Sequence, residues 1–212
     1  MKSRNITGTV GLALVGALAF GQAVAAPSFQ FTTGTTTVDI GAQMQATLDS
    51  QGVTVANVLP AGFDLALGTG VFPIAAGDLD VEGPGGDGQP VLVEILHQGG
   101  LTLTAGGTRV ALTSFALGNL GSASVITAVL KVEDSIVGRI RLFTVTMTQD
   151  PVVVPPSGST AGRVRFSEVE LRLSQTAANA LNTAFGLTDI FDGGSLFGRA
   201  EIFGRIRNND GN

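Results

Sequence analysis

An acidic, glycine-rich segment at 78–89 (DLDVEGPGGDGQ) carries the residues best suited to hold a metal ion. Its carboxylates are hard oxygen ligands, the kind that calcium prefers: Asp78, Asp80, Glu82 and Asp87. The segment is not an EF-hand, because its twelfth position is Gln89 rather than a bidentate glutamate. The period-2 pattern favours the alternative, a solvated edge strand that turns Leu79 and Val81 inward and its acids outward.

Arginines two residues apart occur three times, as the pairs Arg139 and Arg141, Arg163 and Arg165, and Arg205 and Arg207. On a strand, such residues project from one face about 6.5–7 Å apart. If two of these strands pair, four guanidinium groups could form a ladder that binds an anionic ligand through a carboxylate or phosphate. We expect the first two pairs to lie on adjacent strands near one rim of the fold. The favoured alternative is an exposed face on which nearby acids form weak ion pairs with them: Glu168, Glu170 and Glu201.

His97 is the single histidine of the chain, and it shares strand parity with Val91, Val93 and Ile95. A lone histidine at a strand end is more often a hydrogen-bonded structural residue than a ligand. Nucleophilic catalysis would need a serine beside it, and the sequence has no Gly-x-Ser-x-Gly elbow. Sugar sites normally bring Trp or Tyr platforms, which the chain also lacks. The sequence therefore predicts a protein that is not an enzyme.

The composition of the 212-residue chain excludes further chemistries. With no Cys, it can form no disulfide, thiol nucleophile or Cys-ligated zinc site, and one His excludes a multi-histidine metal site. With no Tyr, no mechanism can use a phenol. The 17 acidic residues against 12 basic ones argue against nucleic acid and anionic membrane surfaces as partners.

The first 25 residues are typical of a secretory signal peptide. Lys2 and Arg4 form a short positive region, an apolar stretch covers 6–20, and Ala23 and Ala25 give a small-residue cleavage signal. The apolar stretch is shorter than the roughly 20 residues that a membrane-spanning helix needs. We therefore expect a secreted or periplasmic protein with a signal peptide (1–25), one domain (26–207) and a polar tail (208–212). No membrane span remains once the signal is removed.

Strands must position these groups, because runs rich in Val, Ile, Thr and Phe recur between turn residues. The runs are 29–32, 36–48, 53–58, 91–97, 101–104, 109–117, 124–132, 137–148, 163–173 and 196–207. They predict an all-β fold, an antiparallel sandwich first and an open barrel second. A transmembrane barrel is disfavoured, because its aromatic girdles are usually built with Tyr and Trp.

Two local features interrupt this pattern. The segment 175–185 follows a capping Ser174, carries one apolar stripe and ends before Gly186, which predicts a short helix. The apolar residues before and after Ser167 and Glu168 have opposite parity, and a β-bulge there would reconcile them.

Several segments, taken in order, resemble secreted bacterial domains of the HtaA type. They are 94–103 (EILHQGGLTL), 109–117, 139–147 (RIRLFTVTM), 169–185 (VELRLSQTAANALNTAF) and the turn at 194–198. The resemblance implies a β-sandwich with a short helix, and members of this family take up haem at the cell surface. The family holds the haem iron with a Tyr, which this chain lacks, and the family's His matches His97 by motif.

These observations predict a non-enzymatic binding or structural module of the bacterial envelope or exterior. One alternative is a haem- or tetrapyrrole-binding protein that uses His97. A second alternative is an adhesion or surface module stabilised by calcium.

Overall fold

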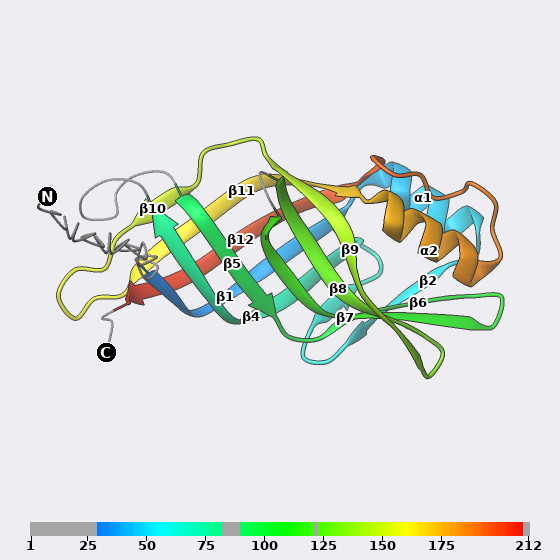
Figure 1. Cartoon of the computed structure of the whole chain (residues 1–212), viewed down its shortest axis with the longest axis horizontal. Helices are drawn as coiled ribbons and strands as arrows, with labels where there is room; N and C mark the ends of the chain where they lie inside the picture. Colours follow the sequence, from blue (N-terminus) through cyan, green and yellow to red (C-terminus); the bar gives the residue numbers. More distant parts are fainter. Residues whose placement is uncertain (1–28, 82–89, 121–122, 210–212) are drawn as a thin grey trace, which may run out of the picture.

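The computed structural model describes residues 29–81, 90–120 and 123–209 (Figure 1). These residues contain twelve strands and two helices. In chain order they are β1 (Phe29–Ile40), α1 (Ala42–Ser50), β2 (Thr54–Val58), β3 (Gly62–Asp64), β4 (Thr69–Val81), β5 (Pro90–His97), β6 (Gly100–Ala105), β7 (Thr108–Leu120), β8 (Ala123–Val132), β9 (Ser135–Met147), β10 (Val152–Val154), β11 (Gly162–Leu173), α2 (Gln175–Phe185) and β12 (Leu196–Asn208). The predicted all-β class is confirmed. Neither described helix is long and apolar enough to cross a membrane.

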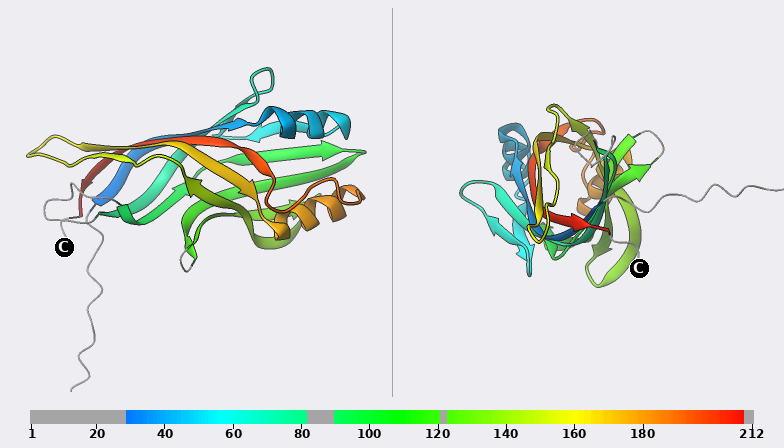
Figure 2. Two further views of the ribbon diagram at one scale, coloured as in Figure 1. Left: turned by 90° about the horizontal axis from the view of Figure 1, so that it is seen from above. Right: turned by 90° about the vertical axis from the view of Figure 1, so that its left-hand side faces the viewer.

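Eight strands close into an antiparallel barrel. The hydrogen-bonded order is β7, β5, β4, β1, β12, β11, β9 and β8, and β8 pairs with β7 to complete the ring. Figure 2 shows the ring in its right-hand view. The described residues therefore form a closed barrel in place of the two facing sheets of the predicted sandwich. Both architectures bury one face of each strand, so the alternation of apolar and polar residues does not distinguish them.

The barrel widens at the end where both helices lie (Figure 1). There β7 pairs with β6 through its first half and with β5 through Ala116 and Leu117, so the sheet branches. Strand β2 extends the branch from β6, while β3 and β10 add to β4 and β11. The long hairpins β6–β7 and β8–β9 run out beside the helices (Figure 1).

The predicted β-bulge in β11 is present. Phe166 lies opposite Ile202 of β12 and Val169 opposite Ala200, so β11 contains one extra residue between the two pairs. Glu168 has a φ of 53°, in the left-handed region. The bulge turns both apolar sets of β11 into the barrel, and Phe166 and Val169 are only 1% and 2% exposed.

The predicted helix is also confirmed, as α2. The Ser174 side chain accepts a hydrogen bond from the Ala177 backbone N–H at 3.0 Å, and Gly186 ends the helix at a φ of 65°. Helix α1 was not predicted, because the run at 36–48 was assigned wholly to a strand. In the structure, the strand ends at Ile40 and α1 begins at Ala42. Its signal is weak, because only Met44 and Leu48 are buried along its length.

Replacing Ser174 by alanine is expected to destabilise the fold by about 1–2 kcal/mol. The hydroxyl has two roles, because it caps α2 and also donates to the Arg141 carbonyl oxygen of β9 at 2.5 Å. Chemical denaturation of Ser174→Ala, with Ser135→Ala at an exposed position of β9 as control, measures the difference. Equal losses in the two variants would contradict the capping role.

Candidate ligand-binding cavity

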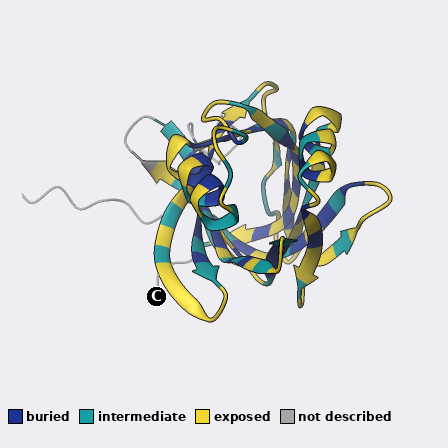
Figure 3. Cartoon of the chain, turned by 90° about the vertical axis from the view of Figure 1, so that its right-hand side faces the viewer, coloured by how far each residue is buried: buried dark blue, intermediate teal, exposed yellow. Residues whose placement is uncertain are grey.

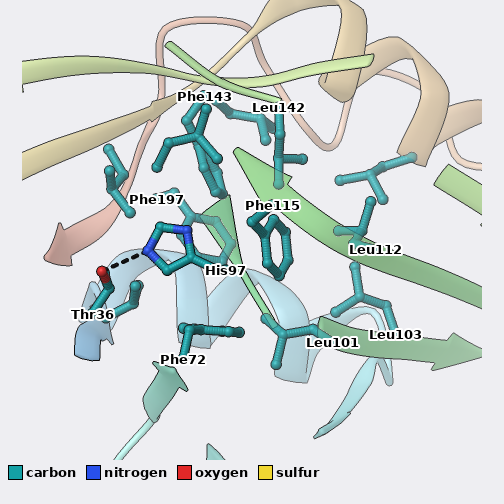
Figure 4. A pocket seen from close by; sticks show the side chains of 15 residues that line it. Thr36, Phe72, His97, Leu101, Leu103, Leu112, Phe115, Leu142, Phe143 and Phe197 are labelled. Carbon is teal, nitrogen blue, oxygen red and sulfur yellow. Dashed lines mark hydrogen bonds between the residues drawn. The ribbon is translucent and has the colours of Figure 1, made fainter. Parts of the chain in front are cut away.

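The wide end of the barrel encloses a partly open cavity of about 60 Å³ (Figure 4). Side chains from nine barrel and branch strands and from α2 line it: Thr36, Val38, Phe72, His97, Leu101, Leu103, Leu112, Phe115, Ile126, Leu142, Phe143, Leu171, Leu173, Leu181 and Phe197. Figure 3 looks onto this end of the molecule, where the two helices flank the barrel. Among the described lining residues, only Thr36 and His97 bring polar side-chain atoms to the cavity, which is almost wholly apolar.

Strand β5 carries His97 into this cavity. Val93, Ile95 and His97 alternate inward and are 5%, 0% and 8% exposed, which confirms their predicted shared parity. The chain turns directly after them, because Gln98 donates its backbone N–H to the Pro73 carbonyl oxygen at 2.9 Å. Gly99 follows at a φ of 79°, so a residue with a side chain would be strained there.

The two ring nitrogens of His97 differ. Nε2 lies 2.7 Å from the Thr36 hydroxyl oxygen and shares a hydrogen bond with it (Figure 4). Nδ1 is buried, and no described atom meets it at ordinary hydrogen-bond distance and angle. Burial lowers the pKa of His97 from 6.5 to about 4, and a hydrogen bond of the ring with the Phe115 backbone acts in the opposite direction. The imidazole is therefore neutral at pH 7.

Four phenylalanines form two walls of the cavity. Phe72 and Phe115 meet edge to face, with ring centroids 5.3 Å apart at 81°. Phe143 and Phe197 are 4.8 Å apart at 41°. All four rings lie around His97 in the cavity lining (Figure 4).

The four predicted ladder arginines are not brought together. Strands β9 and β11 are neighbours, but they pair only through residues 143–147 and 169–173. Because the strands are antiparallel, Arg139 and Arg141 lie beyond one end of that pairing and Arg163 and Arg165 beyond the other. The register of the two strands therefore contradicts the expectation that the four arginines lie near one rim of the fold.

Polar partners surround several of these arginines. Arg165 forms an ion pair with Glu201, as the favoured alternative predicts. Arg139 instead donates to the Ser114 carbonyl oxygen at 2.9 Å. Glu168 and Glu170 are paired with other arginines, Arg199 at 3.1 Å and Arg172 at 3.0 Å.

The candidate calcium ligands are only partly placed. Asp78 and Asp80 lie on β4, where Leu79 and Val81 point inward at 0% and 6% exposure, as the strand alternative predicts. Strand β4 pairs on both sides, with β1 and β5, so it is not an edge strand. Glu82 and Asp87 lie outside the described residues, and calcium binding at these four carboxylates stays a prediction.

Comparison with solved structures shows the fold. The C-terminal domain of HtaA from Corynebacterium glutamicum superposes with a TM-score of 0.57 at 15% sequence identity, covering 84% of this chain and 99% of that domain. The chain has the HtaA-type fold. The N-terminal domain of the same protein gives 0.48 at 10% identity (81% and 97% covered), and the heme binding protein HtaB of that organism gives 0.45 at 11% (84% and 96%). The sequence matches no family model and no curated protein.

Within this HtaA-type fold, strand parity predicts the inward position of His97, but it does not predict the aromatic walls. Two irregularities in the strand register turn Phe115 and Phe143 into the cavity. Ser114, at a φ of 54°, shifts the register of β7 so that Phe115 turns inward, and a second shift in β8–β9 turns both Leu142 and Phe143 inward. The available signal was the parity conflict in 137–148, where Arg139 and Arg141 share parity with Phe143.

Proposed function

We propose that the protein is a secreted, non-enzymatic binding module whose ligand occupies the cavity around His97. The observation that carries this proposal is the partly open and almost wholly apolar cavity, in which His97 is one of the two polar lining residues among those described. Secretion rests on the signal-peptide pattern of residues 1–25, which lie outside the described part of the chain.

The cavity is costly to the folded protein when it is empty. At about 24 cal/mol per Å³, a void of about 60 Å³ costs about 1–2 kcal/mol. A ligand that fills the space would recover this free energy, and this supports binding over a packing defect.

Haem binding is the alternative that the family resemblance implies, and the residues of this cavity do not fit haem. The cavity of about 60 Å³ is far below the range of about 300–1,000 Å³ typical of sites for larger ligands. The histidine nitrogen Nε2 is already bonded to Thr36, and no charged side chain lines the described cavity to meet carboxylates. The alternative therefore ranks second.

Titration with 1-hexanol, followed through the leucine methyl signals in NMR spectra, tests the proposed site. We expect saturable shifts at Leu101, Leu103 and Leu112, which line the cavity, and none at the exposed Leu67. Leu112→Trp fills the space and should weaken binding at least about tenfold, a loss of about 1.4 kcal/mol. Leu67→Trp is the matched control.

Shifts that survive Leu112→Trp, or that spread equally over exposed leucines, would argue against the cavity as the site. A parallel titration with haem tests the alternative that the cavity region binds haem. A Soret band that forms with the natural protein and is lost in His97→Ala would favour haem instead.

A further inference from the structure

We infer that the outer face of the barrel, at the end away from the helices, docks on a membrane surface that carries anionic lipids. Neighbouring strands β10, β11 and β12 form this basic face, and they lie side by side at that end (Figure 1, Figure 2). Its exposed residues are Val152, Val154, Arg163, Arg165, Phe203, Arg205 and Arg207. The inference is independent of the cavity around His97, because the cavity lining includes none of these seven residues.

The register of β11 and β12 places two arginines directly opposite each other. Arg163 is the partner of Arg205 in the antiparallel ladder, and both are exposed. The Cβ atoms of such a pair are about 4.5–5.5 Å apart, and like charges at this distance destabilise a sheet. Neither arginine forms an ion pair with a carboxylate of the described residues. A phosphate group between the two guanidinium groups would relieve their repulsion.

The basic face has an excess of positive charge, although the protein as a whole is acidic. Four of the 12 basic residues of the chain lie on it. Arg165 is paired with Glu201, but Arg207 donates to the neutral Gln30 side chain at 3.2 Å. Three of the four arginines therefore have no carboxylate partner in the described chain. The acidic balance that argues against an anionic surface as partner does not hold for this face.

Apolar side chains alternate with the arginines across the three strands. Val154 lies opposite Arg163. Arg165 lies between Val152 of β10 and Phe203 of β12. The three apolar residues are 61%, 44% and 43% exposed at 152, 154 and 203. Arginine can lay its hydrocarbon stem along such side chains while its guanidinium group stays at the level of the lipid phosphates.

The size and shape of the basic face favour a membrane over other anionic partners. Its backbone covers about 15 Å across three strands and about 14 Å along them, roughly 200 Å². A stable protein interface needs about 800 Å² on each partner. The outer face of a closed barrel is convex, so a single small anion would stay largely in water there. A lipid surface presents many phosphates and hydrocarbon together, and each arginine adds to the attraction.

Vesicle flotation tests this inference with the chain from residue 26 onward, the predicted mature form. Every described strand and helix lies between Phe29 and Asn208, and residues 1–25 are left out because their apolar stretch would itself bind lipid. One set of vesicles contains equal amounts of phosphatidylglycerol and phosphatidylcholine, and the other contains phosphatidylcholine alone. We expect at least about tenfold tighter binding to the anionic vesicles in about 50 mM salt, and weaker binding in about 0.5 M salt.

Three variants locate the contact. Arg163→Gln combined with Arg205→Gln should weaken binding to the anionic vesicles at least about tenfold. Arg109→Gln combined with Lys131→Gln removes two charges from the hairpins beside the helices, and this matched control should change binding by less than about twofold. Phe203→Ser should weaken vesicle binding about threefold to tenfold and leave binding to soluble polyphosphate unchanged.

Equal binding to the two kinds of vesicle, or binding to neither, would overturn the inference. Equal losses from the arginine double variant and its matched control would also overturn it. If Phe203→Ser binds vesicles normally and polyphosphate displaces the natural protein from them, the face recognises polyanions and not a bilayer. A dimer of the natural protein that dissociates in the arginine double variant would assign the face to a second copy of the chain instead.

Discussion

Lowering the pH from 7 to about 4 is expected to reduce the free energy of unfolding by about 3 kcal/mol through His97 alone. The pKa of the folded state is about 4, whereas a histidine in the unfolded chain titrates near 6.5. Between these values the unfolded chain binds a proton that the folded protein does not, so acid favours unfolding. The stability that depends on the neutral ring is fully present above pH 6.5 and is lost as the pH falls toward 4.

Denaturant unfolding of the natural protein and of His97→Gln, each at pH 7.5 and at pH 4, measures this effect. Carboxylates contribute to the pH dependence of both proteins, so the difference between them isolates the histidine. We expect His97→Gln to be less stable than the natural protein at pH 7.5, because the bond to Thr36 is changed. At pH 4 the difference in the free energy of unfolding between the two proteins should shrink by about 3 kcal/mol or reverse its sign. A gap of the same size at both pH values would show that the ring is not held neutral by burial.

Replacing Phe166 by alanine is expected to destabilise the protein by about 3–5 kcal/mol. The ring is 1% exposed inside the barrel and is the largest of the fully buried side chains in the described chain. It also lies directly before the bulge of β11, where the backbone is held by pairing with β12, so the barrel cannot easily collapse around the missing ring.

Phe203→Ala on β12 is the matched control. Phe203 is 43% exposed on the outer face, one residue from the Ile202 that pairs with Phe166, and its loss should cost at most about 1 kcal/mol. Chemical denaturation at pH 7.5 compares the two variants. Similar losses from both would mean that the barrel interior near the bulge is loosely packed.

Features that depend on near neighbours along the chain could be predicted from the sequence. Strand parity placed His97 inward, because residues two apart on a strand share a face. The cap at Ser174 and the glycine at 186 defined α2, since both satisfy backbone groups within one helical turn. The parity change around Glu168 located the bulge, because only an extra residue can turn both apolar sets of β11 into one interior. The resemblance to HtaA-type domains rested on the same ordered strands and helix, and the fold bears it out.

The choice of neighbouring strands and the register of their pairing depend on contacts between distant parts of the chain, so the sequence could not predict them. Alternation identifies the buried face of a strand but not its partner, so it could not separate a sandwich from a barrel closed by β7 and β8. The register of β9 against β11 moved the two arginine pairs to opposite ends of their strands. The cavity also depends on which strands pair, because its lining includes Thr36 of β1, His97 of β5 and Phe197 of β12. No local pattern links residues that far apart in the chain, and only closure of the barrel brings the threonine hydroxyl to the imidazole.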